Sequence, residues 1–370
     1  MKSFKLGLFI PNHKDWMGGV NYYLRLCEMI ASSKCDIEVV TFFDSHSSKE
    51  IMEMYSNIEA VTVVNLSVTS LKQSTYRQLL SLTIGRDPFL AKLVRDYQLD
   101  YIFQNAMFPG WRFNAKVISW IPDLQHFFLP DLFSFNNRVI RTLGFFVQYA
   151  FSHMVVFSSE DARDSFFKIY SFFSRDKSRL LRFSVSNIDF SDLEMLDIKG
   201  KFGLADKFIF VSNQFWPHKN HKLILDAIRI NKISGRRSMQ IVSTGVGSKE
   251  FHSLKDSFSI TDCEFKLLGY VSNDDVSKLL NASVALLNPS LFEGWSTPVE
   301  EAKSINKYML LSNINIHKEQ APYNATFFST DSPNELADLI LDDCNYKSNV
   351  LYNPKKLMQQ FFSDFHNIFS

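Results

Sequence analysis

The sequence predicts an α/β protein built from two doubly wound, Rossmann-like domains. Short apolar runs rich in Val, Ile and Phe alternate with longer segments whose apolar residues recur at helical spacing. This alternation starts again near residue 200, after a polar segment at 184–203. A chain of 370 residues also has the length of two ordinary domains.

Six strands are predicted in the first half because six runs are short and apolar enough to be buried on both faces. They are residues 5–10, 36–43, 60–65, 100–104, 116–121 and 154–157. Residues 20–31 form a predicted helix, since their apolar side chains recur every three or four positions. Strands alternating with helices favour a parallel sheet.

The second half repeats the pattern. Predicted strands are residues 207–213, 239–244, 264–269, 284–288 and 308–312, and predicted helices are 219–230, 274–282 and 298–305. The tail from residue 353 has the pattern of one amphipathic helix. The predicted organisation is therefore a domain at 1–190, a domain at 191–352 and a helix at 353–370.

Composition narrows the class of protein. A formal net charge of +1 gives no support for nucleic-acid binding, and the four cysteines lack metal-ligand spacing and indicate a reducing compartment. The first apolar run is broken at Pro11, and residues 143–157 are too short and too polar to span a membrane. We therefore expect a cytoplasmic protein with at most a peripheral membrane contact. Residues 1–185 carry +4 and residues 186–370 carry −3, which is either chance or a first domain that faces something anionic.

The segment 286–312 carries the most informative motif. Thr297, followed by Pro298 and by Glu300 three positions later, predicts a capping box at a helix start. Side chains lean toward a helix N-terminus, so the Glu301 carboxylate should point back to the loop that holds Glu293. The amides of residues 294–297 would then suit phosphate oxygens.

The string Glu293-Gly-Trp-Ser-Thr-Pro-Val-Glu-Glu-Ala302 resembles the E-x7-E motif of retaining GT-B glycosyltransferases, especially glycosyltransferase family 4. The resemblance implies that Glu301 binds the ribose of a nucleotide sugar and that Glu293 contacts hydroxyls of the transferred sugar. Two unrelated surface acids are the alternative.

A second match is the loop Val211-Ser-Asn-Gln-Phe-Trp-Pro-His-Lys-Asn-His221, which is similar to the family's diphosphate-binding loop. Lys219 takes the lysine position and is expected to open the helix at 219–230. Gln214 stands where the family usually has an arginine. Diphosphate binding should therefore depend more heavily on Lys219.

In the first half, Gly18 and Gly19 lie between a predicted strand and a predicted helix, where they are either a plain turn or a glycine loop facing the diphosphate. The string Ser119-Trp-Ile-Pro-Asp-Leu-Gln-His126 resembles the WIPD-x-QH variant of some bacterial family 4 enzymes. The resemblance implies that His126 contacts the donor sugar or the acceptor hydroxyl, with Asp123 orienting it; a structural histidine is the alternative. The apolar cluster at 127–135 is either core or a rim for a lipid-linked acceptor.

The resemblance thus implies two sets of site residues. The catalytic set is Glu293, His126, Asp123 and Lys219. The donor-binding set is Gly18, Gly19, Asn213, Gln214, Lys219, Tyr270, Val271, Glu293, Gly294, Trp295, Ser296, Thr297 and Glu301. No metal or cofactor is expected, because Asp274 and Asp275 are better explained as acids in the first turn of a helix.

The implied architecture is a GT-B fold whose domains face a central cleft, with the C-terminal helix crossing back onto the first domain. The implied activity is retaining transfer from a nucleotide diphosphate sugar to a glycan or lipid-linked glycan, in the assembly of bacterial surface polysaccharide such as lipopolysaccharide. A nucleotide-sugar epimerase on the same scaffold and an inactive binding subunit are the alternatives.

Overall fold

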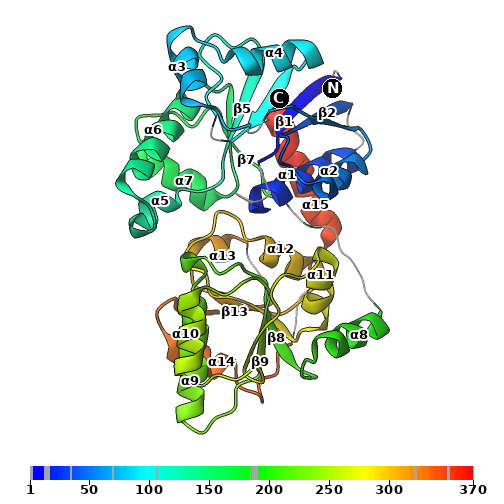
Figure 1. Cartoon of the computed structure of the whole chain (residues 1–370), viewed down its shortest axis with the longest axis vertical. Coiled ribbons are helices and arrows are strands. Elements are labelled where there is room, and N and C mark those ends of the chain that lie inside the picture. Colours follow the sequence, from blue (N-terminus) through cyan, green and yellow to red (C-terminus); the bar gives the residue numbers. More distant parts are fainter. Residues whose placement is uncertain are drawn as a thin grey trace. The chain divides into compact units, whose positions relative to one another are not determined.

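The computed structural model describes residues 3–11, 17–33, 36–68, 71–105, 107–183, 185, 191–320, 323–347 and 351–369. They form two compact units (Figure 1), the first from Met1–Phe183 and Leu357–Ser370 and the second from Ser184–Lys356. Each unit is built around one sheet in which every named strand pairs in parallel. The predicted class, two Rossmann-like α/β domains, is confirmed.

The first sheet has seven strands in the order β3-β2-β1-β4-β5-β6-β7. Their bounds are β1 Phe4–Phe9, β2 Ile37–Phe43, β3 Val61–Asn65, β4 Tyr101–Gln104, β5 Lys116–Ile121, β6 Met154–Phe157 and β7 Ser178–Leu180. The six predicted strands are all present, each within about one residue at either end. The edge strand β7 was missed, because three residues that include an Arg carry no apolar run.

Helices connect these strands. They are α1 Met17–Ser32, α2 Lys49–Ser56, α3 Thr75–Thr83, α4 Pro88–Tyr97, α5 Gln125–Phe128, the 3₁₀ turn η1 Pro130–Leu132, α6 Phe135–Phe151 and α7 Glu160–Ile169. The helix α1 starts earlier than predicted, so Gly18 and Gly19 lie in its first turn and not in a turn before it.

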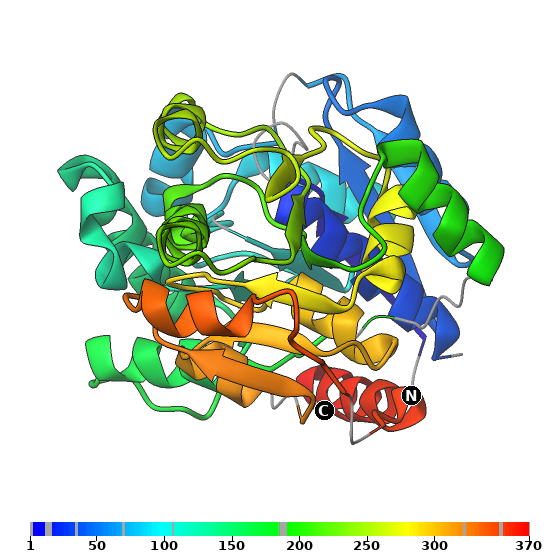
Figure 2. The same ribbon diagram turned by 90° about the horizontal axis from the view of Figure 1, so that it is seen from below.

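The C-terminal helix α15, Pro354–Phe369, packs on the first unit (Figures 1 and 2). The ring of Phe369 lies 4.7 Å from that of Phe4 and 5.0 Å from that of Tyr101, measured between centroids. The Arg179 Nε atom donates a hydrogen bond of 3.0 Å to the carbonyl oxygen of Asn367. The expectation that this helix crosses back to the first domain is therefore confirmed.

The second sheet has six strands in the order β10-β9-β8-β11-β12-β13. Their bounds are β8 Phe208–Val211, β9 Gln240–Ser243, β10 Phe265–Leu267, β11 Ala285–Asn288, β12 Met309–Ser312 and β13 Ala325–Phe328. Five of these were predicted. The edge strand β13 was missed, because two of its four residues are half-buried and one is exposed, which gives no continuous apolar signal.

Helices cover both faces of this sheet. They are α8 Asp192–Phe202, η2 Pro217–Lys219, α9 His221–Ile233, α10 Lys249–Ser257, α11 Asn273–Ala282, α12 Thr297–Ser304, α13 Asn315–Glu319 and α14 Pro333–Leu339. The central strand β8 is buried throughout and alternates between two cores. Ile209 and Val211 pack with α9, α10 and α14, while Phe208 and Phe210 pack with α8, α11 and α12. Because helices pack on both faces of β8, the position of its carboxyl end, where the site begins, is fixed.

Among the described residues, no helix is both long enough and apolar enough to cross a membrane.

Candidate functional site

The candidate site lies at the carboxyl ends of β8 and β11. These strands are neighbours in the second sheet, and the strand order reverses between them, with β9 and β10 on one side and β12 and β13 on the other. In open parallel sheets, ligands bind at such a switch point. The Nδ2 atom of Asn213, just after β8, donates a hydrogen bond of 3.1 Å to Oδ1 of Asn288, the last residue of β11. The two motifs singled out in the sequence therefore meet.

A buried ion pair joins the two loops. The Nζ atom of Lys219 lies 2.7 Å from Oε1 and 2.9 Å from Oε2 of Glu293, although the residues are 74 positions apart. The side chains of Lys219 and Glu293 are 16% and 8% exposed. Both residues were predicted site residues, but the sequence assigned them to different parts of the donor and did not indicate that they pair.

Backbone geometry holds Lys219 in this position. Pro217 begins the 3₁₀ turn η2, and Lys219 is its last residue. Asn220 follows in the left-handed conformation (φ 54°), and its Nδ2 atom donates to the carbonyl oxygen of Thr330 over 3.0 Å. The helix therefore starts at His221, so the prediction that Lys219 opens it was wrong. The Leu291 amide donates to the His218 carbonyl oxygen over 2.7 Å, which ties this turn to the loop of Glu293.

Glu293 is ionised in this environment. Burial would raise the pKa of Glu293, but the charge of Lys219, a smaller contribution from His317, and hydrogen bonds from Lys219 and Ser290 outweigh it and lower the pKa to about 2. The Ser290 hydroxyl donates to Glu293 Oε1 and lies 2.7 Å from it. The Glu293 carboxylate is therefore an acceptor for hydroxyl groups and not a proton donor.

Three further buried side chains support this carboxylate, and the sequence analysis missed them. Asn288 Nδ2 lies 3.5 Å from Glu293 Oε1, and the Ser290 hydroxyl oxygen, whose one proton is donated to Glu293, lies 2.7 Å from Asn288 Oδ1. His317 is fully buried, and burial lowers its pKa to about 4. One sequence signal could have found Asn288 and Ser290, because both lie at or just after the carboxyl end of β11. His317 lies in α13, and its Nδ1 atom is 2.9 Å from the carbonyl oxygen of Ser312, the last residue of β12.

The start of α12 differs from the predicted capping box. The residue before the helix is Ser296, not Thr297, and its side chain caps no amide. The Ser296 hydroxyl accepts from Asn288 Nδ2 over 2.9 Å, and its backbone is bound by Gln320, which donates to the Ser296 carbonyl over 3.0 Å and accepts from its amide over 3.3 Å. The Ser296 amide is therefore already engaged, contrary to the expectation of an amide open to phosphate.

Glu300 is a member of a buried ion pair, so its predicted role as a cap was wrong. Its Oε1 atom accepts from Lys303 Nζ over 3.0 Å and from Gln320 Nε2 over 2.8 Å. The side chains of Glu300 and Lys303 are 2% and 6% exposed. Gln320 is far from both residues in the sequence, yet its side chain links this ion pair to Ser296. The neighbouring predicted residues Gly294, Trp295, Thr297 and Glu301 are all half-buried.

The remaining predicted residues of the second unit flank the site. Gln214 follows β8, and its Oε1 atom accepts from the Trp216 indole over 2.9 Å. Tyr270 is exposed and Val271 half-buried in the loop after β10. The Ser272 hydroxyl accepts from the Asp275 amide over 3.1 Å and caps α11, and Asp274 and Asp275 lie in the first turn of that helix, as predicted. Within the described ranges, no group of three or more His, Cys, Asp or Glu side chains is placed to hold a metal.

The predicted residues of the first unit follow β1 and β5. In the first turn of α1, Gly18 is exposed and Gly19 is buried. The Asp123 carboxylate accepts from the Gln125 amide over 3.0 Å, at the start of α5.

His126 is deeply buried in the first unit. It is 1% exposed and lies against the rings of Phe127 and Phe145. Its Nε2 atom is 3.5 Å from the Thr142 hydroxyl and its Nδ1 atom has no hydrogen-bond partner, so Asp123 does not orient it as predicted. Burial, with smaller contributions from Arg141 and Arg138, lowers the pKa of His126 to about 4.

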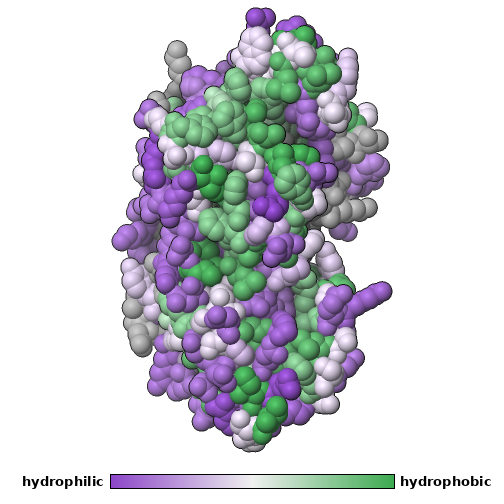
Figure 3. All heavy atoms as spheres, turned by 90° about the vertical axis from the view of Figure 1, so that its left-hand side faces the viewer, coloured by the Kyte–Doolittle hydropathy of each residue, from purple (hydrophilic) through white to green (hydrophobic). Residues whose placement is uncertain are grey.

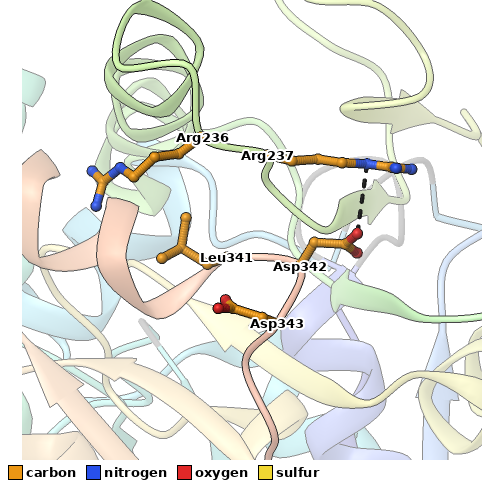
Figure 4. A pocket seen from close by; sticks show the side chains of 5 residues that line it. All are labelled: Arg236, Arg237, Leu341, Asp342 and Asp343. Carbon is orange, nitrogen blue, oxygen red and sulfur yellow. Dashed lines mark ion pairs between the residues drawn. The ribbon is translucent and has the colours of Figure 1, made fainter.

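A surface groove of about 420 Å³ lies away from these residues (Figure 4). It is lined by Arg236, Arg237, Leu341, Asp342 and Asp343. The arginines precede β9, so the groove is at the amino end of the sheet, and its charges balance, with Arg237 Nε 3.5 Å from Asp342 Oδ2. We find no link between this groove and the site.

The fold is that of two-domain GT-B glycosyltransferases, as comparison with solved structures shows. Anabaena Alr3699/HepE, solved in complex with UDP and glucose, superposes with a TM-score of 0.71 at 15% identity, over 99% of this chain and 97% of that one. WaaG, a glycosyltransferase involved in lipopolysaccharide biosynthesis, superposes with a TM-score of 0.64 at 14% identity, over 99% and 95%.

Residues 196–344, which lie within the second unit, match the family model described as "Glycosyl transferases group 1". The segment includes Lys219, Glu293 and Glu301. The serotype-specific mannosyltransferase WbdA of Escherichia coli is 24% identical over 156 residues, which are 41% of this chain and 19% of that protein. The O-antigen chain mannosyltransferase B of Escherichia coli is 22% identical over 225 residues, 60% of this chain and 59% of that protein. The chain thus spans only about a fifth of the length of WbdA.

Proposed function

We propose that this chain is a retaining glycosyltransferase that moves a glycosyl unit from a nucleotide diphosphate sugar to a hydroxyl of a glycan or lipid-linked glycan. The observation that supports it best is the buried Lys219–Glu293 pair at the switch point of the second sheet. It sets a cation and an ionised carboxylate side by side inside the segment that matches the glycosyltransferase family. A sugar diphosphate can use both charges, because a cation binds its phosphate oxygens and a carboxylate accepts hydrogen bonds from its sugar hydroxyls.

On this proposal each part of the donor has a partner in the second unit. Lys219 binds the diphosphate, Glu293 accepts hydrogen bonds from the hydroxyls of the transferred sugar, and Glu301 accepts from the ribose. The loop residues Gly294, Trp295, Ser296 and Thr297 border the phosphates at the N-terminus of α12. Asn213 and Gln214 line the same loop edge as Lys219, and Tyr270 and Val271 border the nucleobase.

The charge that develops on the departing diphosphate is met on this proposal by Lys219 and the N-terminus of α12. The reaction then needs no divalent cation. Glu293 is ionised, so it contacts hydroxyls and does not protonate the leaving group. For retention we favour attack from the face of the leaving group, where the departing phosphate oxygen takes the proton of the acceptor hydroxyl.

His126 is proposed to contact the donor sugar or the acceptor. Because it is only 1% exposed, this contact requires α5, a helix of four residues, to shift. A neutral imidazole would then position a hydroxyl by a hydrogen bond. Gly18 and Gly19 are proposed to offer amides from the first turn of α1.

The proposed pathway is the assembly of bacterial surface polysaccharide. Two similar proteins are named as mannosyltransferases, one for O-antigen chains, and a structural neighbour is named for lipopolysaccharide biosynthesis. The neighbour HepE was solved with UDP-glucose, which supports a nucleotide diphosphate sugar as donor.

The experiment is a thermal-shift panel of UDP-, GDP-, dTDP- and ADP-sugars, because a ligand that binds the native state raises Tm. The donor that binds is then turned over with candidate glycan acceptors in EDTA, and NMR reports the anomeric proton of the product. We expect acceptor-dependent transfer with retained configuration. Consumption of the donor without acceptor would favour an epimerase, and binding without turnover would favour an inactive subunit. Loss of activity in EDTA or an inverted product would refute the mechanism.

A further inference from the structure

The helix α6 presents an unusual surface in the first unit. All residues from 135 to 141, nearly its first two turns, are exposed, and only Phe145, Gln148 and Tyr149 anchor it as buried residues. Apolar side chains in a globular protein normally face the core. Here Phe135, Val139, Ile140, Leu143, Phe146 and Phe151 are between 38% and 74% exposed.

A second helix extends this surface. On α3, the side chains of Tyr76, Leu79 and Leu82 are each more than half exposed. The indole of Trp111, itself exposed, donates to the Leu82 carbonyl over 3.2 Å. From the same loop, the ring of Phe108 lies 5.3 Å from that of Phe151 at the end of α6. We call the exposed apolar side chains of α3 and α6, together with Trp111, the apolar outer surface. Figure 3 looks onto the side of the first unit where α3 and α6 lie, and shows hydrophobic atoms gathered there.

The charged side chains of α3 and α6 have one sign. The segments of α3 and α6 contain no Asp or Glu. Arg138 and Arg141 are exposed on α6, and the exposed Arg112 guanidinium lies 4.4 Å from the Trp111 ring. An exposed apolar helix face flanked by arginines and free of acids is typical of segments that lie in a membrane interface.

We propose that the apolar outer surface docks the first unit on an anionic lipid bilayer. The apolar side chains of α6 and α3 enter the boundary between headgroups and acyl chains, and Arg112, Arg138 and Arg141 lie among the lipid phosphates. The long arginine side chains reach the headgroups while their neighbours are buried. Tryptophan is an amphipathic residue that favours the boundary between headgroups and acyl chains, and Trp111 would lie there.

A second copy of this chain fits the surface less well. In a two-fold symmetric dimer the same patch meets itself, so Arg138 and Arg141 of both copies would approach one another with no acid on α3 or α6 to compensate. An anionic bilayer supplies the opposite charge. The observations therefore favour lipid over self-association.

The test is co-sedimentation of the full chain with vesicles of phosphatidylcholine alone and of phosphatidylcholine with phosphatidylglycerol. We expect binding to the anionic vesicles, weakened by salt, and little binding to the neutral ones. Ile140→Asn with Leu143→Asn should lower the affinity by more than about tenfold. Arg138→Gln should lower it by roughly fivefold. All five positions altered in the test and control variants are exposed, and an unchanged Tm will show that each variant is folded.

Two controls match these changes. Ile233→Asn alters an equally exposed isoleucine on α9 of the second unit, and Arg95→Gln alters an exposed arginine on α4. Neither should change binding. Absence of binding at low salt, equal binding to both vesicle types, or equal binding by the double variant would overturn the proposal. So would a stable dimer of the wild type that the double variant abolishes, because the surface would then be covered by a second copy.

Discussion

Removing the Glu300 carboxylate should destabilise the second unit far more than the loss of a helix cap. In Glu300→Ala, the Lys303 ammonium, whose side chain is 6% exposed, stays buried without its carboxylate, and Gln320 loses an acceptor. Breaking a buried ion pair by removing one partner costs about 3–5 kcal/mol, whereas losing an N-terminal cap costs ~1 kcal/mol. For a unit of this size each kcal/mol lowers Tm by roughly 2–4 °C, so we expect Tm to fall by about 6–20 °C.

Differential scanning calorimetry of three variants tests this reasoning. Glu301→Ala, at the adjacent half-buried position, should change the free energy of unfolding by less than about 1 kcal/mol. Glu300→Leu with Lys303→Met removes both charges and should recover most of the stability. A shift for Glu300→Ala no larger than that for Glu301→Ala, or a double variant no more stable than the single one, would refute the ion-pair explanation.

Four further predictions concern the site. Glu301→Ala should weaken binding of the donor, measured by calorimetry, by roughly ten- to a hundred-fold, because it removes charge-assisted hydrogen bonds to the ribose; equal affinity would contradict the ribose assignment. Lys219→Ala should lower kcat more than it raises KM, since charge on the leaving group is greatest in the transition state, and an unchanged kcat would assign that role to another cation. His126→Ala should lower kcat by roughly 10²–10⁴ and leave donor binding intact; an unchanged kcat would mean that His126 is purely a core residue. Because the pKa of Glu293 lies below its ordinary value of 4.5, at about 2, its stabilising contribution is present above pH 4.5 and is lost as the pH falls toward 2. Glu293→Gln should remove this part of the acid destabilisation in a titration of Tm, and an unaltered pH profile would count against the pair.

The sequence predicts the sheets well because buried parallel strands are continuous apolar runs, and such runs stand out locally. The strands β5 and β6 were predicted to the residue. It also predicts where the site lies, since the carboxyl ends of neighbouring parallel strands share one edge of the sheet. The short edge strands β7 and β13 were missed because half-buried residues leave no such run.

The partners that a polar side chain finds in the core could not be predicted. The spacing of Thr297 and Glu300 satisfies the local rule for a capping box, but Gln320 and Lys303 offer Glu300 partners inside the core, and Ser296 precedes the helix. Likewise, the bacterial motif around His126 indicated an accessible histidine. The aromatic neighbours that bury it include Phe145 on α6, whose position depends on the fold.

If the donor binds as proposed, the pairing of Lys219 with Glu293 has a consequence for which ligands the site accepts. A ligand that draws Lys219 away leaves a carboxylate that is 8% exposed without its counter-ion. Inorganic phosphate offers a replacement for only one member of the pair, and a neutral sugar offers a replacement only for the other. A molecule carrying phosphate oxygens and sugar hydroxyls at the right separation replaces both at once. On the proposed function, the closed pair therefore favours the donor over free phosphate or free sugar, because only a molecule that carries both groups replaces both partners.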